Sequence, residues 1–323
     1  MSRIILLTGA TGTIGKLLLE FLNEKSTTEE LTVRIIVRNV EKARENVKNF
    51  EKLKFEFVEG DLNDLDSLKD PQEVFNQIER LFILTIDSPD KSDIETRLAE
   101  LALEHSPSLE QIVKFSALGA SEDCETNSVF RWQGEAEKSL IKLLKNHNKK
   151  EKNHLVSLVL IRPNLFMQNL LWNDELESIK GGFLIRPDSN PTSLFHISHV
   201  DARDIAELIS IVLLEKDHKK HGNQTYNITG PMVLTYEEIA TMLSNHSGKE
   251  ITYQAVPESY YADILKQAQL PNEFIWTMLK LYQTYKWNPM TRLIFSDFQI
   301  ITGKPQRSFE QFLSDYQFSL KLQ

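Results

Sequence analysis

Three glycines near the start of the chain, Gly9, Gly12 and Gly15, are spaced as G-x-x-G-x-x-G between an apolar run and an amphipathic run. A tight turn after a strand needs glycine for positive φ, and a pyrophosphate needs bare backbone close to it. The helix start that follows supplies N–H groups and the positive end of a dipole. Thr11 and Thr13 add hydroxyl donors. This context predicts a loop that binds a dinucleotide, the alternative being an ordinary strand-to-helix turn.

The end of the next β-branched run, TVRIIV at 32–37, indicates which dinucleotide binds. An acidic residue at this point of a Rossmann unit favours the free ribose hydroxyl of NAD. Here the run ends in Arg38 and Asn39, with no carboxylate. A guanidinium pairs well with a phosphate, so NADPH is favoured over NADH, with Lys42 or Arg44 as assisting cations. The alternative is that Arg38 is only an exposed strand end.

Other polar candidates follow later strands. Asp61 and Leu62, in GDLND at 60–64, are predicted to border the adenine. Two histidines and two aspartates in FHISHVDARD at 195–204 have a spacing that invites a metal, but no further ligand cluster accompanies them, so no metal site is predicted. Cys124 lies among acidic residues, which disfavour a thiolate, and we interpret it as an inert loop cysteine.

These candidates require a particular order of elements. Short β-branched runs alternate with amphipathic patterns through the first half, which predicts an α/β fold with a doubly wound parallel (Rossmann) sheet. From Pro163 the patterns indicate a second, smaller and mostly helical substrate lobe. The predicted dinucleotide-binding domain covers 1–163 and 192–231, and the predicted substrate lobe covers 164–191 and 232–323. The predicted strands lie at 3–8, 32–37, 55–59, 80–85, 111–117 and 155–161.

Composition limits the class of protein. The 323 residues are 41% hydrophobic and 26% charged, which is typical of a globular protein. A formal net charge of −9 disfavours nucleic acid as a partner. A single cysteine cannot form an internal disulfide, and no apolar run approaches the roughly 20 residues that span a membrane. The start MSRIILLTG lacks the features of a signal peptide, so we expect a cytoplasmic protein without membrane partners.

The order of motifs along the chain resembles the NmrA-like branch of the atypical short-chain dehydrogenase/reductases. The motifs are TGATGTIG, IVRN, GDLND, VKFSALGA, RWQGEAEKSL, LIRPNLFMQNL and HVDARDIA. The resemblance implies a Rossmann domain with a smaller substrate lobe and a preference for NADP(H). Some members of this family reduce quinones, azo compounds or iminium ions, whereas others are redox-sensing regulators that bind the cofactor without turnover.

The resemblance also assigns residues position by position. The phosphate loop would consist of Gly9, Thr11, Gly12, Thr13, Ile14 and Gly15, with Arg38 as the partner of the 2′-phosphate. The residues that flank the nicotinamide half after the fourth and fifth strands would be Thr85, Ser116 and Ala117. The residues that line the nicotinamide pocket and begin the substrate side would be Pro163, Asn164 and Phe166.

One departure from the family pattern bears on catalysis. Short-chain dehydrogenases use Tyr-x-x-x-Lys, but the tyrosine position holds Val129 and the lysine position holds Gln133, while Glu137 matches a family glutamate. Glutamine can hydrogen-bond, yet it has no proton to give near neutral pH. Losing a general acid typically costs about 10²- to 10⁴-fold in rate. We therefore expect Gln133 and Ser116 as catalytic residues acting on an activated acceptor.

The function predicted is an NADPH-dependent reductase that transfers hydride to a quinone-, azo- or iminium-like small molecule. The alternative is a non-catalytic NADP(H) sensor that acts through a protein partner, and the loss of the usual proton donor also agrees with that reading.

Overall fold

The computed structural model describes residues 3–26, 31–68, 70–124, 129–188 and 195–316, and the chain forms two compact units. The first unit consists of Met1–Asp123, Phe130–Arg162 and Ala202–Asn227. The second unit consists of Cys124–Val129, Pro163–Asp201 and Ile228–Gln323. Residues 195–201 and 228–231, which the prediction assigned to the dinucleotide-binding domain, are grouped with the second unit. The reason is that strand β8 (His196–Ile197) pairs with β10 (Leu234–Thr235) of that unit.

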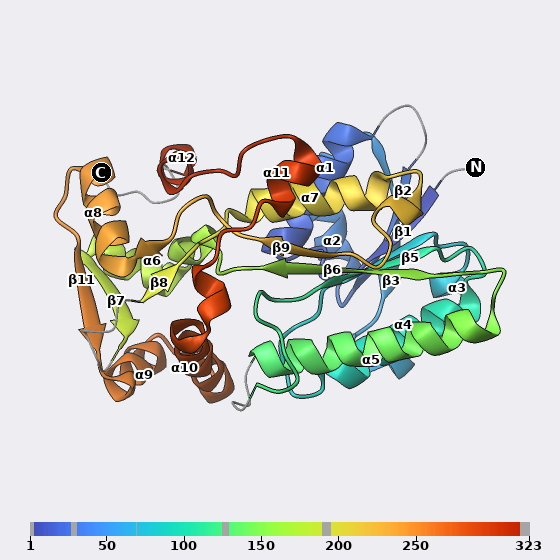
Figure 1. Ribbon diagram of the computed structural model, residues 1–323, viewed down its shortest axis with the longest axis horizontal. Helices are drawn as coiled ribbons and strands as arrows, with labels where there is room; N and C mark the ends of the chain where they lie inside the picture. Colours follow the sequence, from blue (N-terminus) through green and yellow to red (C-terminus); the bar gives the residue numbers. More distant parts are fainter. Residues whose placement is uncertain (1–2, 27–30, 69, 125–128, 189–194, 317–323) are drawn as a thin grey trace. The chain divides into compact units, whose positions relative to one another are not determined.

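The first unit contains a seven-stranded sheet in the order β3-β2-β1-β4-β5-β6-β9 (Figure 1). The strands are β1 (Arg3–Leu7), β2 (Leu31–Val37), β3 (Leu53–Glu59), β4 (Arg80–Ile83), β5 (Gln111–Phe115), β6 (Ser157–Pro163) and β9 (Thr225–Ile228). Each neighbouring pair from β3 to β6 is parallel. This order is that of a doubly wound sheet, so the predicted fold class is confirmed.

The strand order reverses between β1 and β4, which makes that position the topological switch point of the sheet. Because parallel strands share one carboxyl edge, the segments that leave β1, β4 and β5 begin at the same edge. Ligands of doubly wound sheets bind outside this edge. The fold thus selects the segments after Leu7, Ile83 and Phe115 as the place to look for a site.

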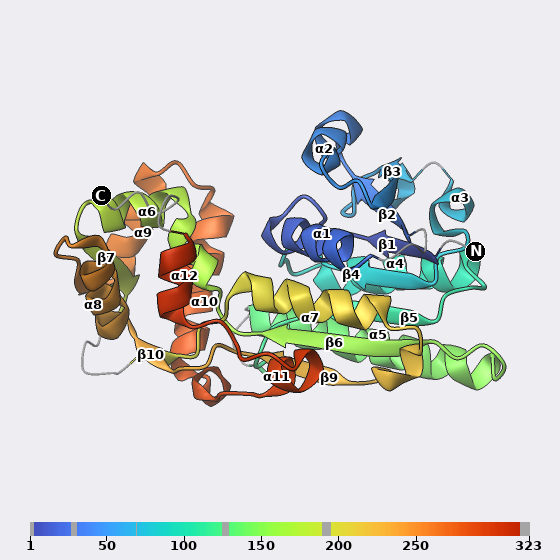
Figure 2. The ribbon, with the colours of Figure 1, turned by 90° about the horizontal axis from the view of Figure 1, so that it is seen from above.

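Helices cover both faces of this sheet. They are α1 (Thr13–Lys25), α2 (Val40–Val47), α3 (Pro71–Phe75), α4 (Lys91–His105), α5 (Val129–Lys150) and α7 (Ala202–Leu214), with the short 3-10 turns η1 (Leu65–Ser67) and η3 (His218–Lys220). In Figure 1, α1 and α7 lie on one face and α4 and α5 on the other, while Figure 2 shows α2 beside β2 and β3. With both faces covered, several strands are largely apolar on both faces, as in β1 and β6, whereas β3, at the edge of the sheet, alternates apolar and charged residues.

The core beneath α4 and α5 is built from fully buried aliphatic side chains, among them Leu81, Leu98, Ile112 and Leu140. Burying one such side chain contributes roughly 1.5–3 kcal/mol. This packing gives the carboxyl edge of β4 and β5 a rigid support.

The second unit is mostly helical, as predicted. Its helices are α6 (Asn173–Lys180), α8 (Tyr236–Ser247), α9 (Glu258–Gln267), α10 (Asn272–Trp287), α11 (Asp297–Thr302) and α12 (Phe309–Asp315), with 3-10 helices η2 (Met167–Leu171) and η4 (Pro289–Arg292). Strand β7 (Phe183–Pro187) pairs in parallel with β11 (Thr252–Val256). Helix α8 shows how local sequence sets a boundary: Thr235 and Glu238 form a capping box at its start, and Gly248, with φ of 70°, ends it.

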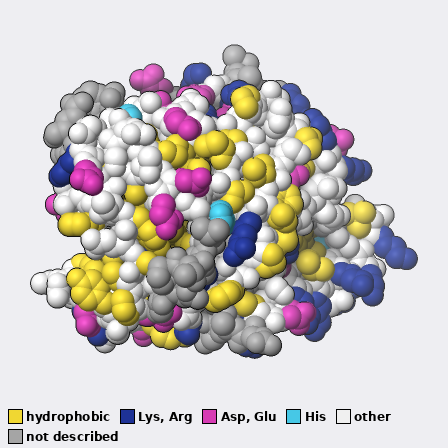
Figure 3. Space-filling model, turned by 60° about the vertical axis from the view of Figure 1, so that its left-hand side comes forward, with side chains coloured by type: hydrophobic (Ala, Val, Ile, Leu, Met, Phe, Trp, Pro, Cys, Tyr) yellow, Lys and Arg dark blue, Asp and Glu magenta, His cyan; other side chains and the backbone are white. Residues whose placement is uncertain are grey.

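Hydrophobic side chains also lie at the surface, beside acidic ones on the face shown in Figure 3. The exposed hydrophobic residues of the second unit include Trp172, Phe274, Trp276 and Trp287. None of the helices in the described ranges is long and apolar enough to cross a membrane.

Candidate active site

The glycine loop joins β1 to α1 at the switch point. Gly9 has φ of +67°, and a Cβ on Gly15 would lie 2.3 Å from the Gly9 carbonyl oxygen, so this turn requires glycine at both positions. Gly12 is the N-cap of α1, and no side chain caps the helix. The first amides of α1 are therefore not satisfied by a capping side chain, which is the arrangement that binds phosphate in other proteins.

The other residues of the glycine loop differ in how exposed their side chains are. Thr11 and Thr13 are exposed at the loop, where their hydroxyls are accessible to a ligand. Ile14 is buried and faces the core, so its contribution to a ligand would come from the backbone. The loop as a whole fits the phosphate-binding role predicted for it.

A pocket of about 910 Å³ lies at the β2–β3 side of the same unit, and Arg38, Arg44 and Asp61 all line it. The Arg44 guanidinium lies over the Phe57 ring, 4.6 Å from its centroid. Arg38 and Arg44 are exposed, and neither forms an ion pair with another described residue. The lining also contains Arg34, paired with Glu56, and four further carboxylates, those of Glu59, Asp61, Asp70 and Glu73. Arg38 and Arg44 are thus the two cations of the lining that could pair with a 2′-phosphate, in a pocket whose other charges are mostly acidic. Leu62, by contrast, packs against the hydrophobic core and is not part of the pocket lining.

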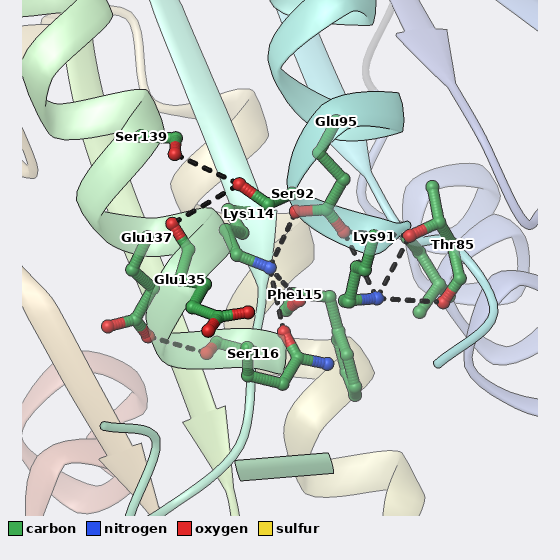
Figure 4. A network of polar contacts seen from close by, with 12 residues as sticks. Thr85, Lys91, Ser92, Glu95, Lys114, Phe115, Ser116, Glu135, Glu137 and Ser139 are labelled. Atoms are coloured by element: carbon green, nitrogen blue, oxygen red, sulfur yellow. Dashed lines mark hydrogen bonds and ion pairs between the residues drawn. The ribbon is translucent and has the colours of Figure 1, made fainter. Parts of the chain in front are cut away.

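A buried network of charges lies under the carboxyl ends of β4 and β5 (Figure 4). Lys91 and Lys114 flank Glu95, with Nζ-to-carboxylate distances of 3.1 and 2.7 Å. All three side chains are fully buried. Lys91 also donates to the Thr85 hydroxyl at 2.9 Å, and that hydroxyl donates to Glu95 at 2.8 Å. The Thr85 proton is therefore committed to Glu95, so toward a ligand Thr85 is an acceptor.

The charges in this network stabilise one another. Burial alone would raise the pKa of the Glu95 carboxyl, but Lys114 and Lys91 outweigh it and hold the pKa below its ordinary value. Burial lowers the pKa of Lys114, and the attraction of Glu95 offsets this only in part. Asp87, 3.4 Å from Lys91, is the second anion of the group. Two cations and two anions thus face each other.

Gln133 connects this network to the carboxyl edge. Its Oε1 accepts a hydrogen bond from Lys114 Nζ at 2.7 Å, and its Nε2 donates to Asp87 Oδ1 at 2.8 Å. Because an ammonium group only donates, the amide oxygen must face Lys114 and the amide nitrogen must face away from it. A Cβ on Gly134 would lie 2.3 Å from the Ser121 carbonyl carbon, so glycine at this position lets α5 approach the segment after β5. Gln133 is therefore a positioned donor.

Ser116 belongs to a second buried chain of contacts. Its hydroxyl donates to the Glu137 carboxylate, which in turn pairs with Arg162, whose Nε lies 2.9 Å away. The hydroxyl proton is thus taken, so toward a ligand Ser116 is an acceptor like Thr85. Glu137 thus fixes the orientation of the Ser116 hydroxyl, and Arg162 neutralises the Glu137 charge.

For the other residues that the sequence assigned to the nicotinamide region, the structure gives a position but no contact that tests their role. Ala117 is buried after β5, Pro163 is the last residue of β6, and Val129 is the first residue of α5. Asn164 donates to Ser198 within the second unit, and Phe166 pairs with Val200 there. The roles of Ala117, Pro163 and Phe166 beside a nicotinamide stay predictions.

Sequence reasoning missed Lys91, Glu95 and Lys114. Two signals in the sequence covered all three. The first is Lys114, since a lysine in the apolar run QIVKF cannot reach solvent if the strand is covered on both faces. The spacing of Lys91 and Glu95, four residues apart on one helix, is the second signal.

Comparison with known proteins identifies the family of this chain. Residues 1–292 match the NmrA-like family. The chain belongs to the NmrA-like family. A relative named NAD(P)H azoreductase, from Xenophilus azovorans, is 26% identical over 309 residues, covering 96% of both chains.

Solved structures show the same fold. A Citrobacter sp. triphenylmethane reductase complexed with NADP(H) aligns with a TM-score of 0.74 and 21% identity, over 97% of this chain and 99% of the other. An NADPH-dependent quinone oxidoreductase from Escherichia coli, complexed with NADPH, aligns with a TM-score of 0.76 and 19% identity, again over 97% and 99%. At these identities the likeness establishes the fold.

Proposed function

We propose that this protein is an NADPH-dependent reductase that transfers hydride to an activated small-molecule acceptor of the quinone, azo or iminium class. The observation that carries the proposal is the Gln133 amide, which donates a hydrogen bond near the carboxyl edge at the position that corresponds to the lysine of Tyr-x-x-x-Lys in typical short-chain dehydrogenases. Membership of the NmrA-like family and the reductase names of its relatives support the cofactor and the reaction class.

The residues that would hold the cofactor lie in the first unit. The glycine loop would bind the pyrophosphate with its backbone amides, and Arg38 with Arg44 would bind the 2′-phosphate. Thr85 and Ser116, whose own protons are committed, would accept hydrogen bonds from hydroxyl or carboxamide groups of the nicotinamide half. When bound, NADPH supplies the hydride.

The same residues restrict the acceptor. Gln133 stabilises negative charge by donating a hydrogen bond, but it cannot deliver a proton. A simple ketone would become an alkoxide that needs a proton during the reaction. A quinone takes the hydride to give a hydroquinone anion, and water supplies the second proton afterwards. The site therefore suits acceptors whose reduced form is a stable anion or is neutral from the start, as for an iminium ion.

The test is NADPH oxidation by the purified protein with menadione, an azo dye and cyclohexanone, with NADPH binding measured in the same samples. We expect multiple turnovers with menadione or the dye and none with cyclohexanone. Tight NADPH binding without turnover of any acceptor would contradict the reductase and favour a non-catalytic NADP(H) sensor, because a sensor needs only differential binding of the two cofactor forms.

A further inference from the structure

We propose that Lys114 is a positioning residue, which holds the Gln133 amide so that its N–H2 group stabilises the oxyanion formed on the acceptor. The inference rests on the proposed reductase function and deepens it, since it explains how a chain without the usual proton donor would stabilise the product anion. Lys114 contacts neither cofactor nor acceptor in this account and acts through Gln133 alone.

Lys114 is saturated by three partners. Its Nζ donates to Gln133 Oε1 at 2.7 Å and to the Phe115 carbonyl at 3.1 Å, and it lies 2.7 Å from Glu95 Oε2. Two of the three ammonium hydrogens are donated in these hydrogen bonds, and the contact with Glu95 is an ion pair. The side chain is fully buried and extends from the middle of the sheet. Lys114 can therefore neither rotate nor exchange partners with water, and the position of the amide oxygen follows.

The outer end of the amide is held more loosely. Gln133 Nε2 donates to Asp87, whose side chain is 34% exposed and also attracts Lys91. An amide nitrogen has a second hydrogen, and no other acceptor for it occurs among the described residues. Gln133 is itself buried, with 3% of its surface exposed, and its direction is set by Lys114 on the inner side, while one amide hydrogen is left without an acceptor among the described residues.

The balance of charges around Lys114 also supports its role in positioning Gln133. Lys91 and Lys114 balance Glu95 and Asp87, so a new anion on the acceptor is added to a neutral group rather than a negative one. Removing the Lys114 charge would leave an excess of one negative charge in a buried place, where charges are poorly screened. Lys114 thus acts by orienting the donor, and its charge keeps Glu95 paired, so that this carboxylate does not compete for the Gln133 N–H2 group.

No covalent change occurs at Lys114. A quinone receives a hydride, which is two electrons and one proton, and one of its oxygens becomes an anion. Gln133 donates a hydrogen bond to that oxygen, and a proton from water completes the hydroquinone. The Lys114 proton stays on its nitrogen throughout.

The experiment is a double-mutant cycle with menadione under anaerobic conditions. Gln133→Leu is expected to lower kcat roughly 10²- to 10³-fold, the usual effect of losing one oxyanion donor. Lys114→Met is expected to lower kcat about 10- to 100-fold in the wild-type background and less than about twofold in the Gln133→Leu background, because non-additive effects mark residues that act as one unit. Lys138→Met, an exposed lysine on the same helix as Gln133, is the matched control and should leave kcat unchanged.

A second readout does not depend on turnover. Binding of para-nitrophenolate in the presence of NADP⁺, followed by its absorption spectrum, should weaken about 10-fold or more in Lys114→Met, while NADPH affinity stays within about twofold of wild type. If Lys114→Met folds poorly, Lys114→Gln replaces it, since a glutamine retains a donor for Gln133 without the charge.

The outcomes separate the two proposals. Equal losses from Lys114→Met in both backgrounds, or unchanged kcat and phenolate affinity, would overturn the positioning role. If wild type binds NADPH and the phenolate but reduces nothing, the reductase proposal fails, and the phenolate affinities of the variants still decide the role of Lys114.

Discussion

Both units bury a cluster of opposite charges, but the two clusters use their remaining hydrogen bonds differently. In the first unit the two lysines around Glu95 also hold Thr85 and Gln133 at the carboxyl edge of the sheet. In the second unit Arg186 pairs with Glu175 at 2.6 Å and donates to the Ile185 carbonyl at 2.7 Å. In our proposal the first cluster orients polar groups for a ligand, whereas the described contacts of the second stay within its own unit.

Aromatic rings close the second cluster. The Arg186 guanidinium lies 4.6 Å from the Tyr236 ring centroid and 5.5 Å from that of Tyr282, and Glu175 accepts a hydrogen bond from Tyr261 at 3.2 Å. Burial alone would lower the pKa of Arg186, but Glu175 and the tyrosines around it keep it well above its ordinary value. A cation on ring faces is stabilised by about 2 kcal/mol when it is desolvated.

The comparison shows two ways of stabilising buried charges, one by sharing a carboxylate between lysines and the other by packing an arginine against aromatic rings. Arg186 directs its described hydrogen bonds to Glu175 and to the neighbouring Ile185 carbonyl, and rings cover its face. Lysines that share one carboxylate keep hydrogens for Thr85 and Gln133, at the cost of depending on that carboxylate. We therefore expect the two clusters to respond differently to the same substitution.

The largest effect is expected from Glu95→Gln. It leaves two buried lysines without their shared anion, and removing one partner of a buried ion pair typically costs about 3–5 kcal/mol of the free energy of unfolding. Glu175→Gln is the matched change in the second unit, and its cost should be smaller because Arg186 retains the ring faces of Tyr236 and Tyr282. Urea unfolding followed by circular dichroism measures both. A loss for Glu175→Gln equal to or greater than that for Glu95→Gln would show that the rings do not compensate.

The next largest effect is expected on NADPH affinity, which we assign in part to Arg38 in the first unit. Arg38→Ala should weaken NADPH binding by about 1.5–3 kcal/mol, roughly 10- to 100-fold, because it removes a charged hydrogen-bond donor from the 2′-phosphate. NADH affinity should change little, and Glu175→Gln, in the other unit, should leave both affinities as in wild type. Titration of intrinsic fluorescence gives these constants. Equal losses for NADPH and NADH would contradict the assignment of Arg38.

A smaller effect is expected from acid, and it should arise in the second unit. Burial, reinforced by the charge of Arg186, lowers the pKa of His199 from 6.5 to about 3. Below pH 6.5 His199 is therefore protonated in the unfolded chain but stays neutral in the folded chain. The free energy of unfolding consequently decreases as the pH falls. Between pH 7 and pH 5 this loss is about 2 kcal/mol.

Glu95 should behave differently over the same range. Its pKa lies below the ordinary value of 4.5, so the stability it contributes is lost only in more acidic solution. His199→Gln should remove most of the change between pH 7 and pH 5 in the urea midpoint. An unchanged pH dependence in that variant would assign the acid sensitivity to another group.

Local signals predicted the cofactor side of the site. The glycine spacing at Gly9, Gly12 and Gly15 and the cation at Arg38 each lie within one strand-to-helix connection, so neighbouring residues carry the information. The structure brings Arg38, Arg44 and Asp61 into one pocket, whereas Leu62 turns into the core. A dipeptide at a strand end does not reveal which of its side chains faces solvent.

The network around Glu95 could not be predicted in the same way. Lys114 lies on β5, Glu95 and Lys91 on α4, and Gln133 on α5, so the contacts depend on how a strand and two helices pack. The sequence, read with its family resemblance, identified Gln133 as the departure from the usual pattern. The contacts with Lys114 and Asp87 fix which end of this amide accepts and which end donates.

One measurement decides whether this site performs reduction: anaerobic NADPH oxidation by the wild-type protein with menadione and with cyclohexanone, at matched concentrations, with NADPH affinity determined on the same sample. Our account predicts tight NADPH binding, many turnovers with menadione and no detectable turnover with cyclohexanone. Comparable kcat/KM values for both acceptors would contradict it, because they would require a proton donor that Gln133 is not.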